Sequence, residues 1–327
     1  GTRATTVALT ALVVANVGTI CAEFAGVAAG MEVLTGWSRY LTVPFAALAV
    51  GVLVLRGSFA RVEHVLLVLS AIFIAYICSG VLAAPDWGAT ARGLVVPSLP
   101  STRHGILVVV ATLGTTLAPW GLVFIQSYAV DKRLRVKDLA YERVDVVSGA
   151  VLTGIIGVFI VVACAATLHA TGKHIHEASD AAIALRPLAG SSAQTLFGLG
   201  LVGAGLLAAA VVPLSTAYSV AESFGQRCDL NDGFREAPLF YGAYGFTILL
   251  AITLVLIPGA PLIPILFLSQ ALNAVLLLAI LPFLRRLARD PELMGTYRLG
   301  RLDSFLTGLV IGLVAASVVT LGVLSLL

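Results

Sequence analysis

The sequence predicts an all-α integral membrane protein that forms a single transmembrane domain. Of its 327 residues, 59% are hydrophobic and only 11% are charged, whereas a soluble domain carries a charge on about a quarter of its residues. The apolar residues gather in stretches of roughly 20, the length of helix that crosses the hydrocarbon core of a bilayer. Because lipid offers no hydrogen-bond partners, helices that bond their own backbone are the expected spanning structure.

Nine stretches meet this description, and short loops join most of them. The second and the seventh are short, so their ends are the least sharply defined. We expect spans over residues 6–34, 40–55, 63–84, 105–130, 145–169, 194–222, 239–258, 262–284 and 303–327.

The lysines and arginines of the loops orient these spans. When the N-terminus is placed in the cytoplasm, fifteen of the 20 lysines and arginines fall on the cytoplasmic side and the other five fall outside. Cytoplasmic loops of membrane proteins carry such an excess of positive charge. We therefore expect a multi-pass protein of the cell membrane, with the N-terminus of this chain in the cytoplasm and its C-terminus outside.

Small and polar residues interrupt the fourth span around a proline. Pro119 has no backbone N–H, and its ring clashes with the carbonyl of Thr115, four residues earlier. The carbonyls from Thr115 to Ala118 should therefore lack helical partners and face either protein or a wet cavity. Unwound carbonyls at this depth bind cations in broken-helix transporters. The alternative is a simple proline kink whose free carbonyls are bonded by the hydroxyls of Thr115 and Thr116.

Two further spans carry polar side chains at mid-depth. In the first span, Asn16, Thr19 and Glu23 share one helix face, and a carboxylate inside a bilayer usually faces a cavity or a partner. We expect an ion or proton path there, or a structural carboxyl paired with a neighbouring helix. In the eighth span, Gln270 and Asn273 also share a face, where their amides either hold an ion or join two helices.

Motifs of other functional classes are absent from the sequence. There is no GxSxG, HExxH or Walker-type loop, so we expect no enzyme activity and no cofactor. No basic stripe with interleaved aromatic residues suggests a nucleic-acid partner. The expected partners are the lipid bilayer and a transported solute.

Five segments resemble motifs of one membrane protein family. A loop leads into the broken span, a Thr-x-x-Ala-Glu pattern lies in the first span, and two segments lie near the end of the chain. These segments are Gly93-Leu94-Val95-Val96-Pro97-Ser98-Leu99-Pro100, Gly114-Thr115-Thr116-Leu117-Ala118-Pro119-Trp120, Thr19-Ile20-Cys21-Ala22-Glu23-Phe24, Leu268-Ser269-Gln270 and Glu292-Leu293-Met294-Gly295. Over essentially the whole chain, the sequence resembles the NRAMP family of divalent-metal transporters.

The resemblance implies a LeuT-like inverted-repeat transporter fold, in which the nine spans correspond to family helices three to eleven. Residues 1–103 would be the remainder of the first repeat, 104–284 the second repeat and 303–327 the final helix. The first two family helices, with their metal-binding Asp-Pro-Gly-Asn motif, have no counterpart in this sequence. We therefore expect the chain to be a fragment of a longer protein.

The resemblance also implies a metal site, and this sequence departs from the family pattern at several positions of that site. Ala118 stands where the family has a methionine, a soft ligand, and Trp120 stands where it has a histidine. Ile20 replaces an aspartate of the third helix, although Glu23 remains. The resemblance implies that the backbone carbonyls of residues 118–121 and the side-chain amide of Gln270 bind the metal. The residues of the implied metal site are Thr115, Ala118, Trp120, Gly121 and Gln270.

These departures resemble the NRAMP-related magnesium transporter branch. They imply a facilitator or secondary transporter for hard ions, Mg²⁺ or Mn²⁺, without tight proton coupling. Glu23, Asn16 and Asn273 would line the ion or proton path. The alternatives are a proton-coupled Mn²⁺/Fe²⁺ transporter that relies on Glu23, an organic-solute carrier of the same architecture, and a membrane scaffold that transports nothing.

Overall fold

The computed structural model is helical wherever it shows regular structure. It describes residues 2–55, 68, 71–96, 102–131, 133–168, 172, 178–228, 232–260 and 262–326. Within these ranges there are helices and no strand, which agrees with the predicted fold class. Part of the predicted third span and residues 97–101 of the loop before the broken span lie outside the described residues.

Seven helices of the described ranges are long and apolar enough to cross a membrane. One of them is the broken span, which consists of α6 and α7. The elements of these spans are α1 (Thr2–Thr35), α6 (Arg103–Thr116), α7 (Pro119–Asp131), α8 (Leu139–Thr167), α10 (Ala193–Ser223), α11 (Pro238–Val255), α12 (Leu262–Arg289) and α14 (Arg301–Leu326).

The two remaining predicted spans are not confirmed as such. The second corresponds to α2 (Arg39–Leu55), an apolar helix of 17 residues. The third is described only in part, as a 3-10 turn, η1 (Ala71–Ile74), followed by α4 (Ala75–Leu82). The division of the chain into two repeats stays a prediction. Connecting elements are α5 (Trp87–Val95), η2 (Val136–Asp138), η4 (Ala178–Leu185), α9 (Arg186–Ala189), η5 (Gly190–Ser192), α13 (Pro291–Met294) and η6 (Gly295–Tyr297).

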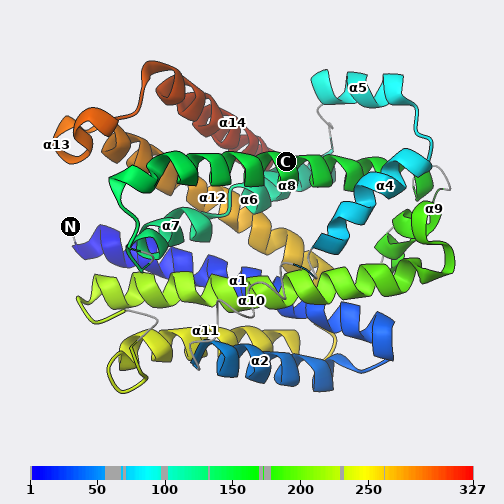
Figure 1. Cartoon of the computed structure of the whole chain (residues 1–327), viewed down its shortest axis with the longest axis horizontal. Helices are drawn as coiled ribbons and strands as arrows, with labels where there is room; N and C mark the ends of the chain where they lie inside the picture. The colour runs from blue at the N-terminus through cyan, green and yellow to red at the C-terminus, as the bar shows by residue number, and fades with distance from the viewer. Residues whose placement is uncertain are drawn as a thin grey trace.

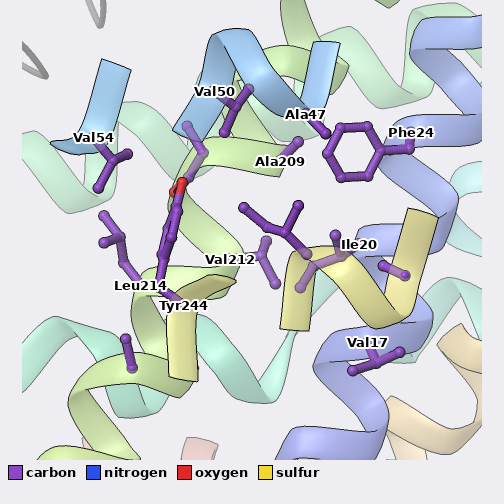
Figure 2. Packing of buried hydrophobic residues seen from close by; sticks show 14 of the residues in the cluster. Val17, Ile20, Phe24, Ala47, Val50, Val54, Ala209, Val212, Leu214 and Tyr244 are labelled. Carbon is purple, nitrogen blue, oxygen red and sulfur yellow. The ribbon is translucent and has the colours of Figure 1, made fainter. Parts of the chain in front are cut away.

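The largest core joins α1, α2, α10 and α11. Figure 1 shows α1 and α10 in the middle of the molecule, with α2 and α11 along one edge. Figure 2 shows how side chains of all four helices meet there, among them the buried Phe24 of α1, Val50 of α2 and Tyr244 of α11. These buried apolar contacts hold the four helices together, because cores of this kind are closely packed.

Glycines allow α1 and α10 to lie unusually close. A side chain at Gly30 would meet the Gly198 carbonyl at 2.9 Å, and one at Gly205 would meet the Glu23 carbonyl at 3.0 Å. Small residues at such crossings let two backbones approach within a membrane. The polar face of α1 is thereby fixed against α10.

A second group of helices, α6, α12 and α14, packs on the other side of α1 (Figure 1). One cluster joins Ile106 and Val110 of α6 with Ala271 and Ala274 of α12. Another joins Leu277 of α12 with Val314 of α14. Since α12 contacts both α1 and α6, it is the helix that connects the two groups.

Candidate functional site

The broken span is interrupted at two residues. Helix α6 ends at Thr116, Leu117 leaves the helical conformation with φ −112° and ψ 51°, and α7 begins at Pro119. Ala118 therefore lies between the two helices, where the proline predicts the break. The Leu117 N–H donates to the Leu113 carbonyl at 3.1 Å, and the Gly121 N–H donates to the Ala118 carbonyl at 3.2 Å.

The structure shows no repair of this break by threonine hydroxyls. The Thr116 hydroxyl donates to the Thr112 carbonyl at 2.6 Å, one turn before the break. In the described ranges the Thr115 side chain makes no hydrogen bond, and it is exposed. The Thr115 carbonyl cannot have a helical partner, because Pro119 carries no N–H. The alternative of a repaired kink therefore finds no support in these contacts.

Glycines set the break directly beside α12. A side chain at Gly114 would collide with the Gln270 carbonyl and lie 2.8 Å from the Ala274 nitrogen. On the other face of α12, a side chain at Gly18 of α1 would meet the Ser269 Cβ at 2.7 Å. Residues 269–274 of α12 are therefore clamped between α1 and α6, so the predicted Gln270 lies next to the broken span.

A network of amides and hydroxyls crosses this junction. Asn273 Nδ2 donates to Gln270 Oε1 at 2.9 Å and to Thr19 Oγ1 at 3.2 Å. Thr19 Oγ1 in turn donates to the Ala15 carbonyl at 3.1 Å. The amides that the sequence places on one face of the eighth span thus bond one another and also reach the polar face of α1.

A second bond ties the same face of α1 to α10. Asn16 Nδ2 donates to Thr216 Oγ1 at 2.9 Å, and both residues are buried. The neighbouring Ser215 hydroxyl donates to the Trp120 carbonyl at 3.1 Å, in the first turn of α7. The start of α7 is therefore fastened to α10, while the end of α6 is fastened to α12.

Two buried oxygens of this network have no partner. Asn16 Oδ1 and Asn273 Oδ1 are the only carboxamide oxygens in the described ranges that are buried without a hydrogen bond. Both residues are fully buried. Leaving a buried acceptor unpaired costs about 1–3 kcal/mol, so such an atom calls for an explanation. Carboxamide oxygens accept from water and coordinate hard cations such as Mg²⁺ and Ca²⁺.

Glu23 lies on the same face of α1 but outside this network. Its side chain is partly buried, and no described group donates a hydrogen bond to its carboxylate. Ile20 is fully buried in the core that α1 forms with α10 and α11. The structure therefore brings Asn16, Gln270 and Asn273 to the junction beside the break, but gives Glu23 no hydrogen bond to any of them.

Two residues of the site were missed by reasoning from sequence. Ser215 and Thr216 of α10 are buried and hold the Trp120 carbonyl and the Asn16 amide, respectively. The available signal was a polar pair two residues after Pro213, within a largely apolar span. The described ranges contain no cluster of three or more His, Cys, Asp or Glu suited to a metal, so the assembled donors are mainly neutral oxygens.

Comparison with known proteins identifies a family model that matches the chain and several similar proteins. A family model described as natural resistance-associated macrophage protein-like matches residues 1–324. The chain is 30% identical over 199 residues to the divalent metal cation transporter MntH of Vibrio campbellii, covering 58% of this chain and 46% of that protein. MntH of Pectobacterium carotovorum is 29% identical over 201 residues, with 59% and 48% covered. The chain thus spans about half the length of the curated relatives it matches.

Proposed function

Since the chain belongs to the NRAMP family, we propose that it takes part in the transport of divalent metal cations across the cell membrane. The observation that carries this proposal is the broken span beside Gln270 and the unpartnered oxygen of Asn273. The relatives are named divalent metal cation transporters, which supports a transporter rather than an enzyme.

The proposed ion site combines main-chain and carboxamide oxygens. The unwound segment at Leu117 and Ala118 offers carbonyls, of which the Ala118 carbonyl also accepts the Gly121 N–H at 3.2 Å, and Gln270 offers its side-chain oxygen. The Asn273 amide donates to this oxygen at 2.9 Å, so it fixes which atom of Gln270 faces the ion. Groups that orient a ligand in this way matter for affinity almost as much as the ligand itself. Water supplies further ligands, because Mg²⁺ keeps several of its waters when it binds to protein oxygens.

The donor set supports a preference for hard ions, Mg²⁺ or Mn²⁺. Oxygen ligands suit these ions, whereas a thioether favours softer metals. Ala118 contributes no sulfur where the family has a methionine. The proposed selectivity rests on this substitution and on the neutral oxygens that surround the break.

The same residues support transport without tight proton coupling. Trp120 cannot exchange a proton at the position of the family histidine, and Ile20 is an apolar side chain within the core. Glu23 is the remaining carboxylate of this group, and it makes no hydrogen bond to the described network. Among the described residues, no hydrogen bond of a titratable side chain therefore links the break to the polar face of α1.

The test is flux in proteoliposomes that contain the full-length protein and dyes for metal and pH in the lumen. We expect Mg²⁺ and Mn²⁺ to enter without a matching acidification. Absence of any divalent flux would refute the transport proposal. Acidification that follows metal entry and disappears in Glu23→Gln would favour the second candidate, a proton-coupled Mn²⁺/Fe²⁺ transporter, which the partly buried carboxylate of Glu23 supports.

A further inference from the structure

A charged cleft lies at one end of α12 and α14, away from the broken span. Its volume is about 640 Å³, and its walls include Arg285, Arg286 and Arg289 of α12 together with Asp290 and Glu292 in the connection to α14. The helices that enclose it are the last turns of α12 and part of α14, which Figure 1 shows side by side near α13.

One arginine of the cleft is held in place by α14. The Arg285 Nη2 donates to the Ser304 hydroxyl at 3.2 Å. The guanidinium lies flat against Gly308, where a side chain would approach its atoms to between 3.2 and 3.4 Å. Its Nε is buried and has no hydrogen-bond partner in the described ranges. Arg285 is therefore pre-positioned by contacts that leave part of its donor capacity unused.

The carboxylates of Asp290 and Glu292 do not neutralise the arginines of the cleft by forming ion pairs with them. No ion pair joins Arg285, Arg286 or Arg289 to a carboxylate within the part of the chain that the structure describes. The Asp290 carboxylate accepts a hydrogen bond from the Glu292 N–H at 2.9 Å, so it acts as a helix cap for α13. Three cations against two carboxylates leave the cleft with an excess of positive charge.

The cleft lies where lipid headgroups meet the protein. The apolar span of α12 runs to Arg289 and that of α14 starts at Arg301, so the arginines mark the boundary of the hydrocarbon core. Arginine binds phosphate through two parallel N–H donors. Basic pockets between transmembrane helices at this level bind anionic lipid headgroups.

We propose that this cleft binds the phosphate group of an anionic phospholipid. The arginines supply the donors, and the exposed apolar surface of α14 beside the cleft accommodates an acyl chain. Positive charge near a membrane boundary also orients a protein, but orientation alone requires neither a cleft nor a guanidinium fixed against Gly308. The inference does not depend on the transported ion.

The experiment compares lipid binding to the full-length protein with and without the exposed arginines. Purified protein in a neutral detergent receives phosphatidylglycerol, phosphatidylcholine or inorganic phosphate, and binding is followed by native mass spectrometry and thermal unfolding. The test variant carries Arg286→Gln and Arg289→Gln. The control carries Arg298→Gln and Arg301→Gln, which remove the same charge outside the cleft lining.

We expect phosphatidylglycerol to be retained and to raise the unfolding temperature of the wild-type protein and of the control. The test variant should bind it roughly tenfold or more weakly, because each arginine near the surface contributes to attraction of anionic lipid. Equal binding to all three proteins, or equal retention of phosphatidylcholine, would overturn the proposal. Stabilisation by inorganic phosphate to the same extent would assign the cleft to free phosphate and overturn the lipid assignment.

Discussion

Asn273 is the residue on which the geometry of the junction depends most. Its amide nitrogen bonds Gln270 of its own helix and Thr19 of α1, while its oxygen remains unpaired in a fully buried position. A single side chain therefore orients a proposed ligand, joins two helix groups and presents an acceptor to whatever occupies the junction. An asparagine does all three because it carries both donors and an acceptor.

Replacement of Asn273 by leucine, a side chain of similar size, removes these bonds and leaves Gln270 Oε1 without its donor. We expect the apparent affinity for the transported metal to fall roughly 10–100-fold, as it does when a supporting partner of a metal ligand is lost. Metal-dependent uptake into proteoliposomes measures this. Ser317→Ala on α14, whose hydroxyl bonds only the Leu313 carbonyl, is the control, and an unchanged affinity in Asn273→Leu would contradict the assigned role.

Ala118 is the second residue whose replacement should change transport, in this case the selectivity between metals. The substitution Ala118→Met adds a thioether at the break, and thioethers prefer soft metals. We expect uptake of Cd²⁺ to rise relative to Mg²⁺ in this variant. Competition between the two metals in the same vesicles measures the shift. If the ratio of the two metals stays as in the unmodified protein, residue 118 does not set selectivity.

Helix α12 owes its position to glycines on the helices that flank it. Gly18 of α1 and Gly114 of α6 leave space that α12 fills with its own backbone or Cβ atoms. Because two helix axes approach most closely where side chains are smallest, these glycines determine which turn of α12 faces the break. The broken helix supplies free carbonyls, and the glycine crossing places Gln270 beside them.

The substitution Gly114→Ala tests this crossing. Its methyl group would collide with the Gln270 carbonyl, which belongs to a rigid helix backbone, so we expect a loss of stability of about 1–3 kcal/mol together with weaker transport. Thermal unfolding in detergent detects the first effect. Gly157→Ala in α8, where nothing lies within 4 Å of the added atom, should be neutral or stabilising. Equal behaviour of the two variants would show that the crossing tolerates a side chain.

The assembled chain divides into a packed interior and exposed apolar helices. Helices α1 and α10 are surrounded by other helices, whereas α8 and α14 expose most of their apolar residues. A protein in water would not leave such large apolar surfaces uncovered. The exposed faces therefore suit lipid, and the charged loops at the span ends suit the two aqueous sides.

Accessibility of single cysteines checks the orientation that the loop charges predict. With the native cysteines replaced by alanine, Ile257→Cys lies just beyond the end of α11, at the end of the span 239–258 that is expected to face outward, and Tyr297→Cys lies in a loop expected in the cytoplasm. Both positions are about half exposed, at 47% and 52%. A membrane-impermeant maleimide applied to intact cells should label the first and not the second. The reverse pattern would invert the topology.

Local chemistry accounts for the features that the sequence predicts well. Runs of apolar residues specify spans, because each span satisfies its own backbone within about 20 residues. The ring of Pro119 excludes the hydrogen bond to Thr115 whatever surrounds it, so the break lies where it is expected. The span predicted over 40–55 corresponds to α2, a helix of 17 residues, and the one predicted over 63–84 lies partly outside the described residues.

Contacts between distant segments account for the features of the site that the sequence does not predict. The bond from Asn16 to Thr216 joins residues 200 positions apart, and that from Asn273 to Thr19 joins residues 254 apart. Neither pairing has a local signature, because a hydrogen bond between helices depends on how their faces are rotated against one another. The amino-acid sequence determines which residues carry oxygens and where a helix must break. Packing of α1, α6, α10 and α12 decides which of those oxygens meet and which are left without a partner.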